Sequence, residues 1–292
     1  KGKSGKPTIN YSGSVGFSDA TVIPKVLDAY DQAILVNDQY RIENVPSTDM
    51  RYFADDELAY LLENRKNFNM LDAVWKTSML TRHTVNVSGG NETVRYFVGG
   101  SYFYEDGSFK NLKFNKYNLR SNLEANITKD LVASLNVSID TRDDQKPYWK
   151  YDNDAETLNN LYRGLLERGS TYPAYIDGKP NGTFSKWHAI ETVNGATGYN
   201  KKKWSSYDVT MSLQYNVPFI KGLNLKLIYN RFDRHTFIKQ FSRPYPLYVF
   251  KTTGSHNHLC TNEVERIDIR DDGDFLYEKY NKDNSYQLNG II

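Results

Sequence analysis

The stretch at residues 85–143 decides the fold: VNVSGGNETVRYFVGGSYFYEDGSFKNLKFNKYNLRSNLEANITKDLVASLNVSIDTRD. Within residues 117–127 apolar and polar side chains alternate, as Leu119 and Arg120 illustrate, and residues 131–139 repeat the pattern. Because successive side chains of a strand point to opposite faces, each segment predicts a strand with one apolar and one polar face. Soluble sandwich strands alternate in the same way, so this pattern alone does not separate a membrane wall from a water-facing sheet.

The composition of the chain limits the classes of protein to which it can belong. The 292 residues leave room for one large domain or two smaller ones. With 37 Lys plus Arg against 35 Asp plus Glu, the net charge is +2, which argues against a nucleic-acid groove. Mean hydropathy is −0.66 and no run approaches the roughly 18 apolar residues of a spanning helix. The low mean hydropathy does not exclude a membrane β-barrel, because only alternate strand residues of such a barrel face lipid.

Two further features concern aromatic residues and cysteine. The 23 tyrosines raise the aromatic fraction to 14%, a level typical of membrane interfaces and of sugar- or protein-binding surfaces. The single cysteine, Cys260, excludes an intramolecular disulfide and therefore the small disulfide scaffolds. The opening KGKSGKP has no apolar core of a signal peptide, so we expect a mature start or further sequence upstream.

Eight strands are predicted along the chain. They are expected at residues 8–17, 81–89, 93–105, 114–127, 130–141, 204–217, 222–238 and 284–292. Helices are expected in the long connections, at residues 25–40, 55–64 and 155–168, because apolar residues there follow helical spacing. Asp177-Gly178 predicts a small hairpin within the connection at 142–203.

The lengths of the connections carry information about the fold. Those at residues 89–91, 128–130 and 218–222 are tight, and those between them are longer, three of them very long. In an up-and-down meander every second connection lies at the same end, so the tight turns share one rim and the long loops the other. This asymmetry is typical of outer-membrane barrels, with short periplasmic turns and long extracellular loops. It predicts that Lys1 enters from the periplasmic side.

Strand length supports the same interpretation. Runs of about ten residues or more match a tilted crossing of a bilayer, whereas soluble strands cluster at about 5 to 6 residues. The sequence therefore predicts an all-β, transmembrane, antiparallel up-and-down barrel with short helices in its extracellular loops. Eight strands can close a small barrel, but the large loops and the abrupt last strand favour a piece of a larger one. A soluble secreted β-rich carbohydrate-binding module or adhesin is the alternative of another class.

Several segments occur in an order that resembles a known family. They are Val87-Ser88-Gly89-Gly90, Tyr96-Phe97, Glu105-Asp106-Gly107, Lys116-Tyr117-Asn118-Leu119-Arg120-Ser121-Asn122 and Ile127-Thr128-Lys129. Together they resemble the SusC/RagA family of TonB-dependent outer-membrane transporters of Bacteroidetes-type bacteria. Lys116 stands where that family more usually has Arg. The resemblance covers nearly the whole chain and is strongest at residues 84–140.

The resemblance implies a 22-stranded barrel in the outer membrane, of which this chain is the first third. It implies a plug and a TonB box upstream, coupling to TonB–ExbB–ExbD, and a SusD-like surface lipoprotein as lid. The expected activity is active import of an oligosaccharide; oligopeptide and siderophore-type import, or an ungated porin, are the alternatives within the class. The resemblance implies neither a cofactor nor an enzyme.

Two groups of candidate site residues follow. We expect the polar faces of the strands to line the lumen, with Arg95, Lys116, Arg120, Glu124 and Lys226. Six aromatic residues of the 142–203 loop are candidates for stacking on a sugar ring, with packing inside the loop or against a lid as the alternative: Tyr148, Trp149, Tyr151, Tyr172, Tyr175 and Trp187. A further set is expected to form an interfacial girdle on the apolar face: Tyr102, Tyr104, Tyr117, Trp204 and Tyr207.

Other motifs predict no chemistry. His256-Asn257-His258-Leu259-Cys260 has metal-ligand residue types, but a closed zinc site needs a fourth ligand, and we expect a polar loop without metal. The acidic segment DIRDDGD at 268–274 lacks EF-hand spacing and predicts a solvated loop. KGKSGKP lacks the spacing of a phosphate-binding loop. No catalytic arrangement can be supported.

Overall fold

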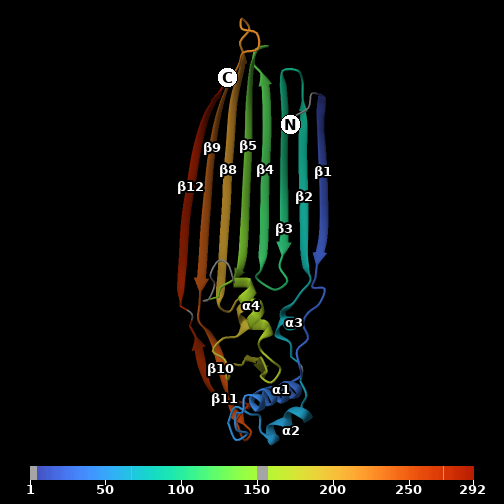
Figure 1. Cartoon of the computed structure of the whole chain (residues 1–292), viewed down its shortest axis with the longest axis vertical. Helices are drawn as coiled ribbons and strands as arrows, with labels where there is room; N and C mark the ends of the chain where they lie inside the picture. Colours follow the sequence, from blue (N-terminus) through green and yellow to red (C-terminus); the bar gives the residue numbers. More distant parts are fainter. Residues whose placement is uncertain (1–4, 67, 150–156, 272) are drawn as a thin grey trace.

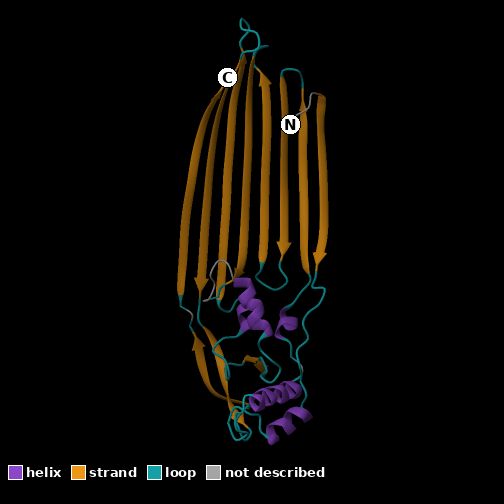
Figure 2. Ribbon diagram, viewed as in Figure 1, coloured by secondary structure: helices purple, strands orange, loops and turns teal. Residues whose placement is uncertain are grey.

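A computed structural model describes all residues except 1–4, 67, 150–156 and 272, and shows one long sheet above a lobe of loops (Figures 1 and 2). The sheet is antiparallel, in the order β1-β2-β3-β4-β5-β8-β9-β12. Its strands are β1 (Gly5–Ser18), β2 (Ser78–Gly90), β3 (Val94–Asp106), β4 (Lys113–Asn126), β5 (Leu131–Pro147), β8 (Gly198–Asn216), β9 (Asn224–Ser242) and β12 (Phe275–Ile291). The predicted fold class, an antiparallel meander forming part of a barrel, is confirmed.

Two of the tight turns have side-chain caps that the sequence provides. Asn91 Oδ1 accepts hydrogen bonds from the backbone N–H groups of Thr93, at 2.9 Å, and Val94, at 2.8 Å. Thr128 Oγ1 accepts from the backbone N–H of Leu131 at 3.0 Å. These turns and both termini lie at the upper end in Figure 1, and the helices lie at the lower end. The predicted separation of tight turns from long loops is therefore observed.

The strands run further toward the loops than we predicted. β5 ends at Pro147 instead of 141, β8 begins at Gly198 instead of 204, β9 ends at Ser242 instead of 238, and β12 begins at Phe275 instead of 284. Both faces are polar in the extensions of β5 and β8, and the extension of β12 has apolar residues without regular alternation, so the period-2 pattern does not mark them. Pairs of opposite charge stabilise the ladder instead, since Asp143 stands opposite Lys203 and Asp144 opposite Lys202.

The sheet has an apolar face but no core of its own. Apart from Pro147 at the loop end of β5, every buried apolar side chain among the described residues lies outside its eight strands. Large apolar side chains on its strands are exposed instead, among them Leu119 (42%), Met211 (51%) and Leu288 (64%). An apolar surface this extended is stable only against a second apolar phase or partner. No helix within the described part of the chain has the length and apolar character to cross a membrane.

The outer boundary of the apolar face runs obliquely across the strands. Tyr207 lies in one cross-strand row with Leu119, Tyr11 and Asn284. The last outward aromatic before the polar, loop-side residues lies six positions toward the loops on β1. On β12 the outward aromatic that precedes Asn284 and Lys282 lies two positions toward the turns, and Tyr280 follows beyond these two polar residues. The boundary residues are Phe17, Tyr104, Tyr117, Tyr207 and Tyr286. A strand tilt of about 40° moves a membrane plane by about one residue per strand, so this drift matches a tilted wall.

The long loops pack together into a lobe (Figure 2). Its elements are α1 (Ala29–Ile42), α2 (Asp55–Glu63), α3 (Met70–Val74), α4 (Thr157–Leu166), β6 (Tyr175–Ile176), β7 (Lys179–Pro180), α5 (Ala189–Asn194), β10 (Tyr245–Thr253) and β11 (Leu259–Arg270). α1 begins later than predicted because Asp28 caps it, accepting from the backbone N–H of Asp31 at 2.9 Å. The hairpin β6–β7 is observed at Asp177-Gly178, both with positive φ. The hairpin β10–β11 was not predicted.

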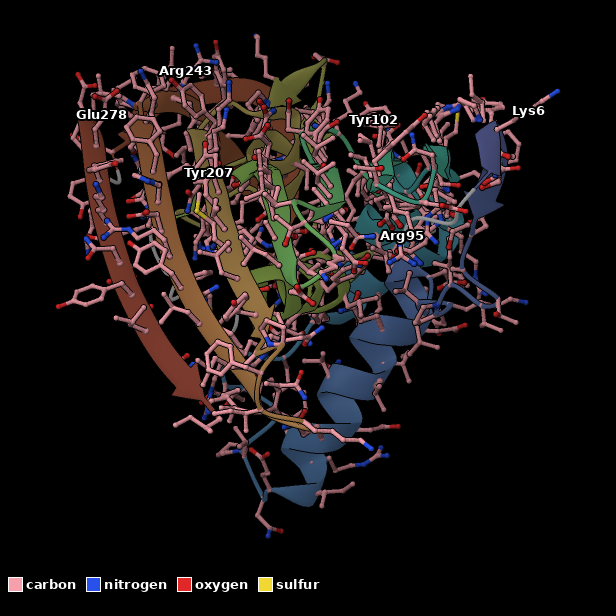
Figure 3. All side chains as sticks on the ribbon, turned by 90° about the horizontal axis from the view of Figure 1, so that it is seen from above. Lys6, Arg95, Tyr102, Tyr207, Arg243 and Glu278 are labelled. Carbon is pink, nitrogen blue, oxygen red and sulfur yellow. The ribbon has the colours of Figure 1, made fainter. Side chains whose placement is uncertain are left out.

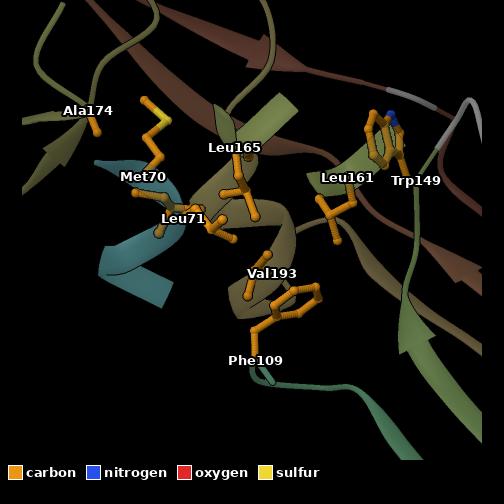
Figure 4. Packing of buried hydrophobic residues seen from close by; sticks show 10 residues of the cluster. Met70, Leu71, Phe109, Trp149, Leu161, Leu165, Ala174 and Val193 are labelled. Carbon is orange, nitrogen blue, oxygen red and sulfur yellow. The ribbon is translucent and has the colours of Figure 1, made fainter. Parts of the chain in front are cut away.

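The core of the molecule sits in this lobe. One buried cluster joins α3, α4 and α5 through residues such as Leu71, Leu165 and Val193, and Phe109 from the β3–β4 connection closes it (Figure 4). A second, smaller cluster joins α1 and α2 through Ala33, Phe53, Leu61 and Leu259. The lobe thus holds loops from separate parts of the chain in one packed unit at the end of the wall.

Candidate functional site

The polar face of the sheet collects all five residues predicted to line the lumen. Arg95 and Glu124 stand opposite one another on β3 and β4, and Arg95 Nη2 lies 2.5 Å from Glu124 Oε1. Lys116, Arg120 and Lys226 lie on the same face by the register of β4, β5, β8 and β9. Figure 3 looks along the strands and shows side chains projecting from both faces of the wall. That this polar face lines a lumen stays a prediction.

Short polar side chains cover most of this face and bond across the strands. Asn122 Nδ2 donates to Asn136 Oδ1 at 2.5 Å, Ser134 Oγ lies 2.7 Å from Ser212 Oγ, and Asn118 bonds Asp140. Such a surface is rich in hydrogen-bond donors and acceptors, which suits the passage of a hydrated polar solute.

A row of cations and aromatic rings crosses the loop-side part of the same face. Its members stand opposite one another on β2, β3, β4, β5 and β8, and we call them the cation–aromatic row: Arg82, Phe103, Lys116, Arg142 and Trp204. The Arg82 guanidinium lies 5.3 Å from the centroid of the Phe103 ring, and that of Arg142 lies 5.0 Å from the Trp204 ring. Arg234 on β9 lies beside the row, 5.6 Å from the same indole. These distances are within the range of cation–π attraction.

A pocket of about 780 Å³ adjoins the row on its loop side. Its wall includes residues two positions nearer the loops on β4, β5 and β8, namely Phe114, Asp144 and Lys202, together with Lys279 of β12. The loop residue Leu112 lines part of it. The pocket therefore lies between the lobe and the polar face. A solute that enters past the loops reaches this pocket before the cation–aromatic row.

The loop aromatics predicted to stack on sugar pack within the lobe where the structure describes them. Trp149 is buried and stacks on Trp187, with ring centroids 4.6 Å apart, and Tyr148 is buried against Phe275. Tyr172 contacts Phe184 with ring centroids 4.4 Å apart. The geometry favours the packing alternative for these side chains, and their role in binding stays a prediction.

Two members of that set differ in their surroundings. Tyr175 donates its hydroxyl hydrogen to Glu191 Oε1 at 2.5 Å, and burial together with this carboxylate raises the pKa of Tyr175. Tyr175 also lines a second pocket of about 770 Å³ between the loops. Tyr151 lies outside the described residues.

The girdle prediction is wrong for Trp204. The register places Trp204 opposite Arg142, on the polar face, while Tyr207 three residues later lies on the apolar face. The odd spacing between them already separates the two faces, since strand side chains alternate. Tyr102 and Tyr117 do meet on the apolar face, with ring centroids 5.0 Å apart.

The histidines of the 256–260 segment join this loop to the first loop of the lobe. His258 Nδ1 lies 3.2 Å from Glu57 Oε2, and His256 Nδ1 lies 2.7 Å from the carbonyl oxygen of Tyr52. Asn181 Nδ2 lies 3.8 Å from Cys260 Sγ, and burial raises the pKa of that thiol. Within the described ranges, no group of three or more His, Cys, Asp or Glu side chains could hold a metal ion.

Sequence reasoning missed Arg82, Phe103, Arg142 and Arg234. Their positions carry a usable signal, because each sits at polar parity in a strand. We assigned Arg142 to a loop, however, since β5 was predicted to end at 141, and Arg234 lies where β9 carries charge on both faces.

Three features define the class of protein. They are the antiparallel meander, the separation of tight turns from long loops, and an exposed apolar face whose aromatic boundary runs obliquely across the strands. The chain is part of the wall of a membrane-spanning β-barrel. No protein-family profile matches it.

Comparisons with known proteins agree on the family. The chain is 26% identical over 206 residues to the TonB-dependent receptor SusC of Bacteroides thetaiotaomicron, covering 70% of this chain and 18% of that protein. It is 28% identical over 109 residues to the TonB-dependent receptor P3 of Formosa agariphila, covering 35% and 11%, respectively. A second Formosa agariphila protein, TonB-dependent receptor P26, is 24% identical over 219 residues, covering 74% and 19%. The chain therefore spans a fifth or less of the length of these relatives.

Solved structures share the fold. A structure of the RagAB peptide transporter matches 82% of this chain and 30% of its own with a TM-score of 0.55 and 16% identity. The RagAB peptide importer in its open-open state matches 99% of this chain and 40% of its own, with a TM-score of 0.53 and 14% identity. The resemblance to the SusC/RagA family is confirmed: the chain is similar to TonB-dependent receptors and has the fold of a segment of an outer-membrane β-barrel.

Proposed function

We propose that the chain forms part of the wall of an outer-membrane importer that takes up an oligosaccharide with energy from TonB–ExbB–ExbD. The observation that carries this proposal is the polar face of the sheet. This face continues from the pocket between the lobe and the sheet, through the cation–aromatic row, to the tight-turn end. It carries hydrogen-bonding side chains along that length. Oligosaccharides present many hydroxyl groups, which such a face can bind weakly and release.

The proposal assigns no covalent chemistry to the chain. The wall contributes a hydrated path, and the lobe contributes a packed rim that narrows the entrance. Coupling to TonB would act through parts of the receptor other than these residues, so the chain's own role is to guide the substrate.

A lid is proposed as the second partner. The helices α1 and α2 lie at the end of the lobe farthest from the sheet (Figure 1). They expose apolar side chains there, including Leu35 (57%), Ile42 (80%) and Leu62 (49%). Exposed apolar residues of this kind are typical of contact surfaces, which supports a SusD-like lipoprotein seated on this end.

The test uses the complete receptor in its native outer membrane. Cells with and without the receptor are given labelled neutral and acidic oligosaccharides and oligopeptides, before and after a protonophore collapses the proton gradient. We expect receptor-dependent accumulation of an oligosaccharide that stops when the gradient is lost. Uptake of peptides alone would reassign the substrate, and uptake that survives the protonophore would indicate an ungated pore.

The lid is tested in the same strain by Leu62→Glu and by Lys186→Glu, an exposed lobe residue outside α1 and α2. We expect the first change to reduce co-purification of the SusD-like lipoprotein with the receptor and the second to leave it unchanged. Equal recovery of the lipoprotein from both variants would contradict a contact through α2.

A further inference from the structure

We propose that the cation–aromatic row and Arg234 bind the acidic groups, carboxylate or sulfate, of an anionic oligosaccharide as it enters the barrel. The proposal rests on the proposed import function for the route of the substrate. The binding preference itself rests on charge and geometry. It deepens the function by naming the charge of the substrate.

The first argument is charge. The row contains three cations and no carboxylate. Among the described residues, Arg82, Lys116 and Arg142 form no ion pair, and neither does Arg234. Some other basic residues of the wall are paired, as Arg95 is with Glu124 and Arg231 with Asp233. The row itself is therefore positively charged and forms no ion pair, while Asp140 and Asp144 lie on the same face of β5, two residues to either side of Arg142.

The second argument is the way the guanidinium groups are held. Trp204 stands on β8 between Arg142 on β5 and Arg234 on β9, and both cations lie within 6 Å of its ring centroid. Attraction to a ring restrains a guanidinium without using its N–H donors. Arginine presents these donors as a planar fork that matches a carboxylate or sulfate group in a bidentate way. The indole thus pre-organises two forks toward an acidic ligand.

The third argument is position. On β8 the outward apolar band ends at Tyr207, and Trp204 lies three residues nearer the loops on the opposite face. The row therefore lies near the outer edge of the membrane on the inner side of the wall. The adjoining pocket is lined by four more lysines and two carboxylates: Lys113, Lys146, Lys202, Lys279, Glu105 and Asp144. An anionic chain passing the loops would meet this positively charged surface first.

The test compares two ligands that differ only in charge. The complete receptor with its lid is titrated with an oligogalacturonate and with the same oligomer after reduction of its carboxylates to alcohols. A sulfated galactan oligomer forms a third arm and separates sulfate from carboxylate binding. The variant is Arg142→Gln with Arg234→Gln, and the matched control is Arg231→Gln, which lies on the apolar face of β9 next to Asp233.

We expect the wild-type receptor to bind an acidic oligomer about tenfold or more tightly than the reduced one, with a preference that falls as salt rises. The double variant should lose this preference and bind the reduced oligomer as wild type does, while Arg231→Gln keeps it. Equal binding of acidic and reduced oligomers by the wild type would overturn the proposal. An equal loss of affinity for both ligands in the double variant would assign the arginines a structural role, and this outcome would also overturn the proposal.

Uptake is measured on the same ligands. If the preference in binding is present but accumulation does not depend on the proton gradient, the import function fails and the anion site stands. If accumulation is driven by the gradient but is the same for acidic and reduced oligomers, the import function stands and the anion site fails.

Discussion

Asn122 and Asn136 face one another across β4 and β5, and the side-chain amide of Asn122 donates to Asn136 Oδ1 at 2.5 Å. One position along each strand, Leu123 and Leu135 form the next cross-strand pair on the opposite face. The wall therefore changes from hydrogen-bonded amide to exposed leucine within one residue. At these two pairs the polar and the apolar face lie closest together, and we expect water on one side and lipid on the other.

Leu135→Arg is predicted to impair assembly, whereas Asn136→Ser is not. A charge on the lipid face near the membrane midplane costs about 2–4 kcal/mol. The serine removes one hydrogen bond worth about 1 kcal/mol on a face that water reaches. The amount of folded receptor in the outer membrane, measured by heat-dependent gel mobility, should fall for Leu135→Arg and stay near wild type for Asn136→Ser. Equal defects would mean that the two faces are wrongly assigned.

Much of the wall could be predicted from the sequence because the physical signal is local. Alternation at residues such as Leu119 and Leu123 fixes the faces, and the Asn91 and Thr128 turns fix which end is which. These features need only neighbouring residues. The order of the sheet then follows, since antiparallel neighbours joined by short turns pair with each other.

The rest could not be predicted because its cause is not local. The Lys201–Lys203 segment has no alternation, and only its partners on β5 and β9 make it a strand. The hairpin β10–β11 likewise depends on contacts with the lobe. The row at Arg142 and Trp204 became visible only when the register placed the two side by side, because sequence spacing alone does not align separate strands.

Gly198→Ala is predicted to disturb the pairing of β8 with β9. Gly198 has a φ of +108°, and a Cβ atom there would lie 2.0 Å from the backbone carbonyl oxygen of Phe241. Backbone strain of this kind costs about 1–3 kcal/mol before the steric clash is counted. The variant should be cleaved faster by an external protease near residue 198 in intact cells.

The control for this change is Gly290→Ala on β12. A Cβ atom at Gly290 meets nothing within 4 Å, and its φ lies outside the positive range that favours glycine. We expect Gly290→Ala to match wild type in protease resistance. If Gly198→Ala is equally resistant, the close approach of Gly198 to Phe241 does not hold in the membrane.

Glu57→Ala is predicted to separate the first loop from the β10–β11 hairpin. The carboxylate of Glu57 is fully buried and accepts from the backbone N–H groups of His258, at 2.9 Å, His256, at 3.1 Å, and Ala54, at 2.9 Å. Removing it leaves buried donors unpaired, which we expect to cost the lobe about 3 kcal/mol. Amide hydrogen exchange at residues 254–258 should accelerate strongly.

Two further variants test whether the buried carboxylate of Glu57 is the cause of the faster exchange. Glu57→Gln keeps one acceptor oxygen and should show a smaller acceleration, and Glu63→Ala, at the exposed end of α2, should show none. Exchange that is unchanged in Glu57→Ala would show that the buried carboxylate does not join the two loops.

Lowering the pH is predicted to loosen the lobe around α5 through His188. This side chain is buried; its Nε2 lies 2.8 Å from the Ala174 carbonyl oxygen, and its Nδ1 accepts from the backbone N–H of Glu191 at 3.2 Å. Burial lowers the pKa of His188 below its usual 6.5, while the nearby Glu191 carboxylate and Arg168 guanidinium act in opposite directions. A proton on Nδ1 would also abolish the bond to Glu191.

The direction in which stability changes with pH follows from the difference in bound protons between the folded and unfolded lobe. Below pH 6.5 the unfolded lobe binds a proton that the folded lobe does not, so stability is complete above this pH and falls as the pH drops through 6.5 toward the folded pKa. The slope is about 1.4 kcal/mol per pH unit in that window. Fluorescence of the stacked Trp149–Trp187 pair, followed in urea at about pH 7.5 and about pH 5.5, should show an earlier transition at the lower pH. His188→Asn retains a helix-capping side chain without a titrating group, so its two transitions should move closer together; a difference as large as in wild type would assign the pH dependence to another group.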